Sequence, residues 1–206
     1  MSNPLQKLID RYEIVLASGS PRRRELLGML DIPFRVDTSH SVDEIVPAGM
    51  PPHEVPGYLS RLKAGAYPIS EDSSLLVIAA DTVVILDGEV LGKPSSAAEA
   101  RAMLGRLAGK TQTVVTGVTI RTAHSEESWS SESEVTFGAL TEEEIDYYVD
   151  KYSPLDKAGA YGVQEWIGAA AIREIKGSFY NVMGLPVHRL YAALRSIQRA
   201  VSEARN

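Results

Sequence analysis

The spacing of apolar and polar positions along the chain predicts alternating strands and helices. Apolar runs of strand length occur at residues 14–17 and 75–86, and the first half of the second run is apolar at every position. Such continuous runs are typical of strands that are covered on both faces. β-branched residues dominate 111–122, which favours a further strand. Because Leu26, Leu27 and Leu30 share one helical face, residues 14–36 are expected to form a strand–helix–strand unit.

Capping and turn residues set the boundaries of the other predicted elements. Strands are expected at residues 14–17, 31–36, 75–86, 89–93, 111–122, 135–137 and 169–175. Helices are expected at residues 5–11, 22–30, 55–67, 96–107, 141–152 and 187–204, with Ser96 and Thr141 as N-caps. Asp87 and Gly88 form a hairpin signal, which should bring Lys93 close to Asp81. The polar segment 124–133 and the segment 177–186 are expected to be loops.

A candidate anion site lies where the first strand gives way to the first long helix. Ser20 is a suitable N-cap, Pro21 suits the first helical position, and Gly19 allows close approach of the backbone to a ligand. The free N–H groups and positive dipole end of a helix attract anions, and arginine binds phosphate with two parallel donors. Arg22 and Arg23 follow directly. The alternative is an ordinary capped helix with solvated arginines.

Composition narrows the class of protein. With 206 residues and 44% hydrophobic content, the chain can bury a sizeable core. Neither a repeat nor a composition shift marks a boundary, so one domain over residues 1–206, with its core at about 12–198, is expected. The 27 acidic and 21 basic residues give a net charge of -6, which argues against a protein that binds the phosphate backbone of polymeric nucleic acid. The absence of cysteine excludes thiolate chemistry and disulfides.

No apolar run is long enough for a membrane helix, and the first residues lack a secretory signal. We therefore expect a soluble, cytoplasmic protein without a membrane partner.

Asp81 is the most conspicuous single residue because it follows six apolar residues. A carboxylate in that place needs a cation, since an unpaired buried charge is strongly unfavourable. Two interpretations stay open: a salt-bridged structural residue, or a ligand of a divalent metal that orients water. Glu44 offers a second oxygen ligand for Mg²⁺ or Mn²⁺, although a solvated loop carboxylate is the simpler interpretation.

Two lysines and a glutamine complete the candidate chemistry. Lys63 and Lys93 are candidate phosphate contacts, and an exposed helical lysine is the alternative for Lys63. Gln164 lies in a glycine-rich segment, 156–164, that also contains Lys157 and allows close backbone approach. An amide both donates and accepts, which suits the edge of a pyrimidine. The alternative is a bulged strand with a surface glutamine.

Several separated motifs resemble the Maf-like nucleotide pyrophosphatase family. In chain order they are LASGSPRRRELL at 16–27, ADTVV at 80–84, GKP at 92–94, GKT at 109–111, TGV at 116–118, DKAGAYGVQ at 156–164, GS at 177–178 and NVMGLP at 181–186. The match runs from residue 14 to about 190.

The resemblance implies hydrolysis of a nucleoside triphosphate between the α- and β-phosphates, with a divalent metal. It implies an α/β fold, with an elongated, twisted mixed sheet flanked by helices and a cleft between two lobes, and often a homodimer. The aspartate that matches Asp81 is taken as the acid–base residue in that family. Arg22, Thr82 and Gln164 match the set of the branch acting on dTTP and UTP, rather than the branch acting on 7-methyl-GTP.

The chain departs from the family pattern at two places. The family's Arg-Leu-Ala-x-x-Lys-Ala is shortened here to RLKA at 61–64, which rotates the positions that follow, so the direction of Lys63 stays open. Gln112 stands where the family has histidine and cannot titrate near neutral pH.

The mechanism expected from the sequence divides the site residues by role. Ser18, Arg22 and Arg23 are expected to hold the triphosphate together with Lys93 and Lys63, while Arg24 lies at the surface. Asp81 is expected to bind the metal with Glu44 and to activate water. Thr82 and Gln164 are expected to recognise the base, and Arg22 adds to this specificity. The expected substrates are dTTP and UTP, with modified pyrimidine nucleotides as an extension, in a house-cleaning role. The alternative is a nucleotide-binding regulator of cell division with little turnover, suggested by the shortened helix.

Overall fold

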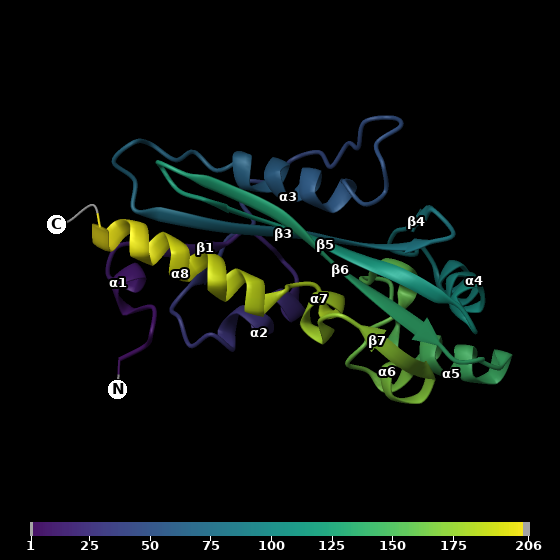
Figure 1. The fold of residues 1–206 in the computed structure, drawn as a ribbon. Coiled ribbons are helices and arrows are strands. Elements are labelled where there is room, and N and C mark those ends of the chain that lie inside the picture. The colour runs from purple at the N-terminus through teal and green to yellow at the C-terminus, as the bar shows by residue number, and fades with distance from the viewer. Residues whose placement is uncertain (1, 204–206) are drawn as a thin grey trace.

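The computed structural model describes residues 2–203, and over these residues the chain forms a seven-stranded mixed sheet flanked by helices (Figure 1). The strand order is β2-β1-β3-β5-β6-β7, and β4 pairs with β3. Strands β1 and β2 run parallel to β3, whereas β4, β5, β6 and β7 pair antiparallel. The strands are β1 Glu13–Leu16, β2 Arg35–Val36, β3 Leu75–Leu86, β4 Glu89–Leu91, β5 Thr111–Arg121, β6 Glu126–Phe137 and β7 Ile172–Lys176. The predicted α/β sheet is confirmed.

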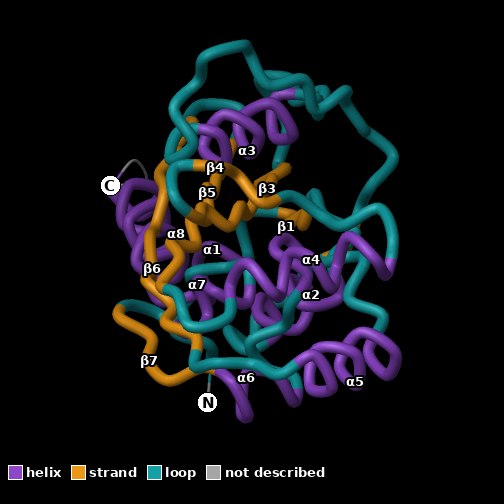
Figure 2. The backbone as a smooth tube through the Cα atoms, turned by 90° about the vertical axis from the view of Figure 1, so that its right-hand side faces the viewer, coloured by secondary structure: helices purple, strands orange, loops and turns teal. Residues whose placement is uncertain are grey.

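Helices cover both faces of this sheet. Figure 1 shows α3 on one face and α1, α2, α7 and α8 on the other, while the end view in Figure 2 separates the same layers. The helices are α1 Gln6–Ile9, α2 Pro21–Gly28, α3 Val55–Gly65, α4 Ala97–Leu107, α5 Glu142–Tyr152, α6 Trp166–Ala171, α7 Phe179–Met183 and α8 Val187–Glu203, with a 3-10 turn, η1, at Ala158–Ala160. No helix among residues 2–203 is long and apolar enough to cross a bilayer.

Strand β3 contributes side chains to the cores on both faces. Its alternate residues point to opposite sides. Ile78 and Ala80 belong to the large core that contains Leu26 and Leu27 of α2. Val83 and Ile85 pack with residues of α3 on the other face. The alternation therefore sends Asp81 to the α3 face and Thr82 to the α2 face.

Gly117 allows α3 to lie close to the sheet. It pairs with Asp81 across the β3–β5 ladder. A Cβ atom at Gly117 would lie 2.2 Å from the carbonyl oxygen of Pro56, at the start of α3. Since real Cβ contacts are not this short, only glycine permits the observed packing.

The local signals for caps and turns are confirmed. Ser96 and Thr141 cap α4 and α5, and Thr141 forms a complete capping box with Glu144. Asp87 and Gly88 have φ values of 52° and 81°, and the strands beside them pair as a hairpin.

The prediction of a loop at 124–133 is wrong, because residues 126–137 form the long strand β6. This strand pairs with β5 along its length. Its glutamate side chains are exposed and three of its serines are partly exposed, while Trp129, Ser133 and Val135 are buried. A strand with one polar face lacks a continuous apolar run, and for that reason its sequence pattern indicates a loop.

Three other boundaries also differ from the prediction. Residues 169–171 end helix α6, so the strand expected at 169–175 begins only at Ile172. The segment expected to be an irregular loop contains α7, which Ser178 caps. The second strand, expected at 31–36, covers only Arg35–Val36. The last helix is expected to end at residue 204, which lies outside the described residues.

Candidate active site

A cleft opens where strand β3 changes neighbours. Its first half pairs with β1, whose last partner pair is Leu16 with Ile78. Its last residues pair with β4, starting at Val84 and Leu91. The edge of β3 between these two pairings holds Asp81 and Thr82. Loops that leave β1 and β4 at the same gap supply the residues around them, in a cavity of about 660 Å³.

The predicted cap at the start of α2 is confirmed. Ser20 has an extended backbone, its hydroxyl accepts a hydrogen bond from the Arg23 N–H (3.4 Å), and Pro21 occupies the first turn. The first turn of α2 contains no acidic residue. Ser18, which precedes it, is 9% exposed and lines the cleft. The helix end therefore presents positive potential to the cleft.

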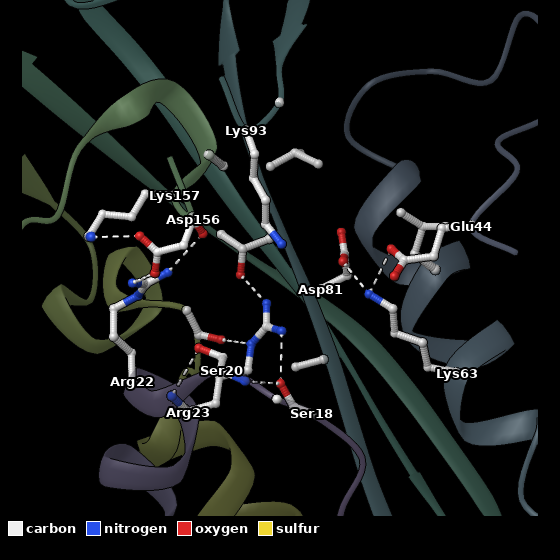
Figure 3. Close-up of a pocket in the computed structure, with 18 of the residues that line it drawn as sticks. Ser18, Ser20, Arg22, Arg23, Glu44, Lys63, Asp81, Lys93, Asp156 and Lys157 are labelled. Atoms are coloured by element: carbon white, nitrogen blue, oxygen red, sulfur yellow. Dashed lines mark hydrogen bonds and ion pairs between the residues drawn. The ribbon is translucent and has the colours of Figure 1, made fainter. Parts of the chain in front are cut away.

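Arg23 is fastened by three protein oxygens. Its Nε donates to the Gly184 carbonyl (2.9 Å), one terminal nitrogen donates to Ser18 Oγ (3.3 Å), and the other donates to Thr82 Oγ1 (3.0 Å). Burial lowers the pKa of Arg23, and the charge of Asp81 opposes that effect. The guanidinium has a fixed orientation at the floor of the cleft (Figure 3).

Arg22 takes a different direction from its neighbour. Its Nη1 lies 2.7 Å from Asp156 Oδ2, and Lys157 Nζ lies 2.7 Å from the other oxygen of that carboxylate. Burial opposes ionisation of Asp156, but hydrogen bonds from Lys157 and Arg22 outweigh it and lower the pKa to about 2. Arg24 is exposed, as predicted.

On the α3 face, Lys63 joins two carboxylates. Its Nζ lies 2.7 Å from Asp81 Oδ1 and 2.8 Å from Glu44 Oε2 (Figure 3). The Asp81 side chain is 14% exposed, so the ammonium compensates a largely buried charge. The question that the shortened helix left open is thus answered, because Lys63 points into the cleft and contacts Asp81.

Lys93 and Gln164 enter from the remaining walls. Lys93 follows β4, as the hairpin predicted, and its ammonium points between Asp81 and Arg23 (Figure 3). Gln164 is exposed and lines the cleft beyond the η1 turn. The structure therefore brings all the sequence-predicted site residues to one cavity: Ser18, Arg22, Arg23, Glu44, Lys63, Asp81, Thr82, Lys93 and Gln164.

The carboxylates of the cleft fit a divalent cation whose remaining ligands are oxygens of a bound phosphate. Mg²⁺ is usually held by one or two carboxylates and by phosphate oxygens of the substrate. Within residues 2–203, no group of three or more His, Cys, Asp or Glu side chains is arranged to hold a metal. Asp81 and Glu44 both contact one cationic atom, Lys63 Nζ. Two convergent carboxylates of this kind match the expected donor set.

Several supporting residues received no role from the sequence. Asp156 anchors Arg22. Thr116 Oγ1 lies 2.9 Å from Thr82 Oγ1 and donates to the carbonyl of Asn181 (3.0 Å). Asn181 is fully buried and ties α7 to β5 through the Val114 carbonyl. Asp156, Thr116 and Asn181 all lie in motifs that carry the family resemblance, and this position in a motif is what marks them in the sequence.

Gln112 has a structural place behind the cleft. It is buried, and its amide nitrogen donates to the hydroxyl of Tyr161, which lines the cavity (3.2 Å). Burial raises the pKa of Tyr161. The residue that departs from the family pattern therefore supports the cleft wall from behind.

A cleft with five Lys or Arg side chains, a helix N-terminus and four carboxylates, two of which meet at Lys63, is typical of a protein that binds a phosphorylated small molecule. Residues 13–197 match the model of the Maf-like protein family. The chain belongs to this family.

Relatives with high identity cover nearly the whole chain. A protein of Bacteroides thetaiotaomicron named dTTP/UTP pyrophosphatase is 51% identical over 189 residues, which are 92% of this chain and 98% of that protein. A protein of Porphyromonas gingivalis with the same name is 54% identical over 190 residues, 91% of this chain and 95% of its own. One from Cytophaga hutchinsonii is 46% identical, with 92% and 86% covered.

Among solved structures, the nucleoside-triphosphatase described as a dITP/XTP pyrophosphatase of Mycobacterium abscessus aligns over 93% of this chain and 97% of its own. The TM-score is 0.43 and the identity is 13%.

Proposed function

We propose that the protein hydrolyses dTTP and UTP between the α- and β-phosphates, giving the nucleoside monophosphate and pyrophosphate. The observation that carries this proposal is the meeting of Asp81, paired with Lys63, and the arginine-rich start of α2 in one cleft. The names of relatives that are about half identical over most of this chain support the same substrates. Removal of surplus or modified pyrimidine nucleotides from the nucleotide pool is the role that we infer.

The triphosphate is held at the α2 side of the cleft. Ser18, the free N–H groups of the helix and Arg22 face the place where phosphate oxygens would lie. Arg23 contributes a fixed positive charge, because three protein oxygens already orient it. Lys93 adds a mobile charge from the opposite wall.

The chemical step uses Asp81 as the general base. Its carboxylate takes a proton from a water molecule while the water oxygen attacks the α-phosphorus. A new P–O bond forms to the α-phosphorus, the bond to the bridging oxygen breaks, and that oxygen leaves with pyrophosphate. Lys63 and Lys93 stabilise the charge that develops on the leaving group.

Asp81 and Glu44 would hold Mg²⁺ or Mn²⁺. When bound, the cation supplies neutralisation of phosphate charge and lowers the pKa of water. Lys63, which lies between the two carboxylates, keeps their charges compensated in the free protein.

The pyrimidine base is recognised at the wall of the cleft that follows the η1 turn, where Gln164 lies. Gln164 offers both an amide donor and an acceptor to the base edge. Thr82 was expected to read the base as well. Because its hydroxyl contacts Arg23 and Thr116, we propose instead that Thr82 acts by holding Arg23 in place.

A regulator without turnover is the less favoured function. That alternative rested on a displaced Lys63, and the 2.7 Å contact between Lys63 and Asp81 argues against displacement. We extend the proposal to three further expectations that rest on the sequence and the family resemblance: a single domain, a homodimer and a cytoplasmic location.

Product analysis tests the proposed function. Purified protein is incubated with dTTP, UTP, dATP and GTP in the presence of Mg²⁺ or Mn²⁺, and the products are separated by anion exchange. The expected products are dTMP or UMP with an equal amount of pyrophosphate. Release of orthophosphate and a diphosphate, or equal rates with purine nucleotides, would contradict the proposal.

A further inference from the structure

A continuous chain of polar contacts runs from Gly162, through Tyr148 of α5, to Arg22 at the start of α2. The N–H group of Gly162 donates to the hydroxyl of Tyr148 (3.0 Å), and that hydroxyl donates to one oxygen of Glu165. The other oxygen of Glu165 lies 3.2 Å from Lys157 Nζ. Lys157 Nζ also lies 2.7 Å from Asp156 Oδ1, and the other oxygen of Asp156 lies 2.7 Å from Arg22 Nη1.

Charges alternate along this chain, so each buried charge has partners. Lys157 is 7% exposed and lies between two carboxylates. Tyr148 is fully buried, and burial together with its hydrogen bond to Glu165 raises its pKa, which keeps the phenol protonated as a donor. Removal of the Tyr148 hydroxyl or of the Glu165 carboxylate takes one hydrogen-bond or ion-pair partner from a buried neighbouring group.

The turn at the end of this chain is tightly constrained. A Cβ atom at Gly162 would lie 2.8 Å from Glu165 Cδ and 3.1 Å from Gln164 Nε2. Ala160, two residues before, has a φ value of 60°, in the region that non-glycine residues rarely adopt. Such a backbone persists where the surroundings hold it.

Tyr148 and Glu165 lie outside the cleft wall, whereas Asp156 and Lys157 line the cavity together with the two ends of the chain. Arg22 and Gly162 both line the cavity, and Gln164 follows Gly162 closely in sequence. Neither Tyr148 nor Glu165 is among the lining residues. The pair therefore connects the segment that carries Gln164 to the ion pairs that end at Arg22, and neither residue is among the groups that face the cavity.

We propose that Tyr148 and Glu165 are positioning residues for nucleotide selectivity, which fix the distance between Arg22 and Gln164. This inference rests on the proposed function for the choice of nucleotide, and it extends the recognition machinery to residues outside the cleft. A pyrimidine triphosphate is selected because its base reaches Gln164 only while its phosphates are held at Arg22.

Binding measurements test this role independently of turnover. Calorimetry measures the dissociation constants of the α,β-imido analogues of dTTP and dGTP for the wild-type chain and for Tyr148→Phe and Glu165→Gln. The expected result is a preference for the dTTP analogue in the wild-type protein that falls about tenfold in both variants. Tyr147→Phe, a substitution of the half-exposed neighbour that accepts a hydrogen bond from Lys151, should leave the preference unchanged.

A melting curve of each variant separates positioning from a merely structural role. A lowered Tm with an unchanged preference would overturn the inference, as would a wild-type protein without preference. Glu165→Gln keeps a hydrogen-bond acceptor for Tyr148, so its binding preference still tests the inference if Tyr148→Phe does not fold. Failure of wild-type hydrolysis with preserved selective binding would instead count against the proposed function alone.

Discussion

Gly117 lies directly opposite Asp81 across the β3–β5 ladder, and α3 approaches the sheet at that glycine. The close approach places Lys63, near the end of α3, in contact with Asp81 on the same face. Backbone packing at one residue thus determines an ion pair in the cleft.

The first prediction concerns this packing. Gly117→Ala should destabilise the protein by about 1–3 kcal/mol, since overpacking forces α3 to move. Activity should fall with it, because Lys63 moves with the helix. Chemical denaturation and turnover of dTTP provide the two measurements. Gly105→Ala, at an exposed helical position without neighbours within 4 Å, is the control and should stabilise by about 0.5–1 kcal/mol. An equal response of the two variants would refute the packing argument.

The second prediction concerns the charge of Lys63. Lys63→Met should lower kcat/KM for dTTP by about 10²-fold, a typical cost of losing one group that stabilises transition-state charge. Steady-state kinetics with saturating Mg²⁺ measures the loss. The matched control is Lys176→Met, whose ammonium pairs with Glu134 at the exposed surface, 3.4 Å away. A loss of less than threefold, or an equal loss in the control, would remove Lys63 from the reaction.

The third prediction concerns the hydroxyl of Thr82. Thr82→Val should cost about 1–3 kcal/mol of unfolding free energy, because Arg23 and Thr116 each lose a hydrogen-bond partner. The KM for dTTP should rise as Arg23 loses its orientation. Thr111→Val removes an exposed hydroxyl from the pair with Thr136 and should change stability by less than about 0.5 kcal/mol. Unchanged KM in Thr82→Val would speak against the positioning of Arg23.

The fourth prediction concerns acid stability. The pKa of Asp156 is lowered from 3.8 to about 2 in the folded protein, so the unfolded chain binds more protons between these values. The stabilisation by this carboxylate is present above pH 3.8 and is lost as the pH falls towards 2. The difference in unfolding free energy between the wild-type chain and Asp156→Asn should shrink over that range. Urea titrations at several pH values measure it, and a difference independent of pH would contradict the assignment.

Local signals in the sequence were sufficient for the anion-binding end of the site. Ser20 and Pro21 act within one helical turn, and the Asp87–Gly88 turn alone brings Lys93 back towards Asp81. These features depend on neighbouring residues, which a sequence displays directly.

Contacts between distant segments could not be predicted in the same way. The direction of Lys63 depends on the space at Gly117, and Asp156 meets Arg22 across 134 positions. The pattern of β6 does not indicate a strand, because its more polar face consists of glutamate, serine and threonine, and its pairing with β5 and β7 identifies it as one.

The most direct test of the whole account is the rate of pyrophosphate release from dTTP by Asp81→Asn. The substitution keeps the shape of the side chain and removes the base, so kcat should fall by about 10²–10⁴-fold while the protein still binds dTTP. Asp72→Asn, at an exposed position before β3, should retain full activity. Turnover by Asp81→Asn at the wild-type rate would contradict the proposed mechanism.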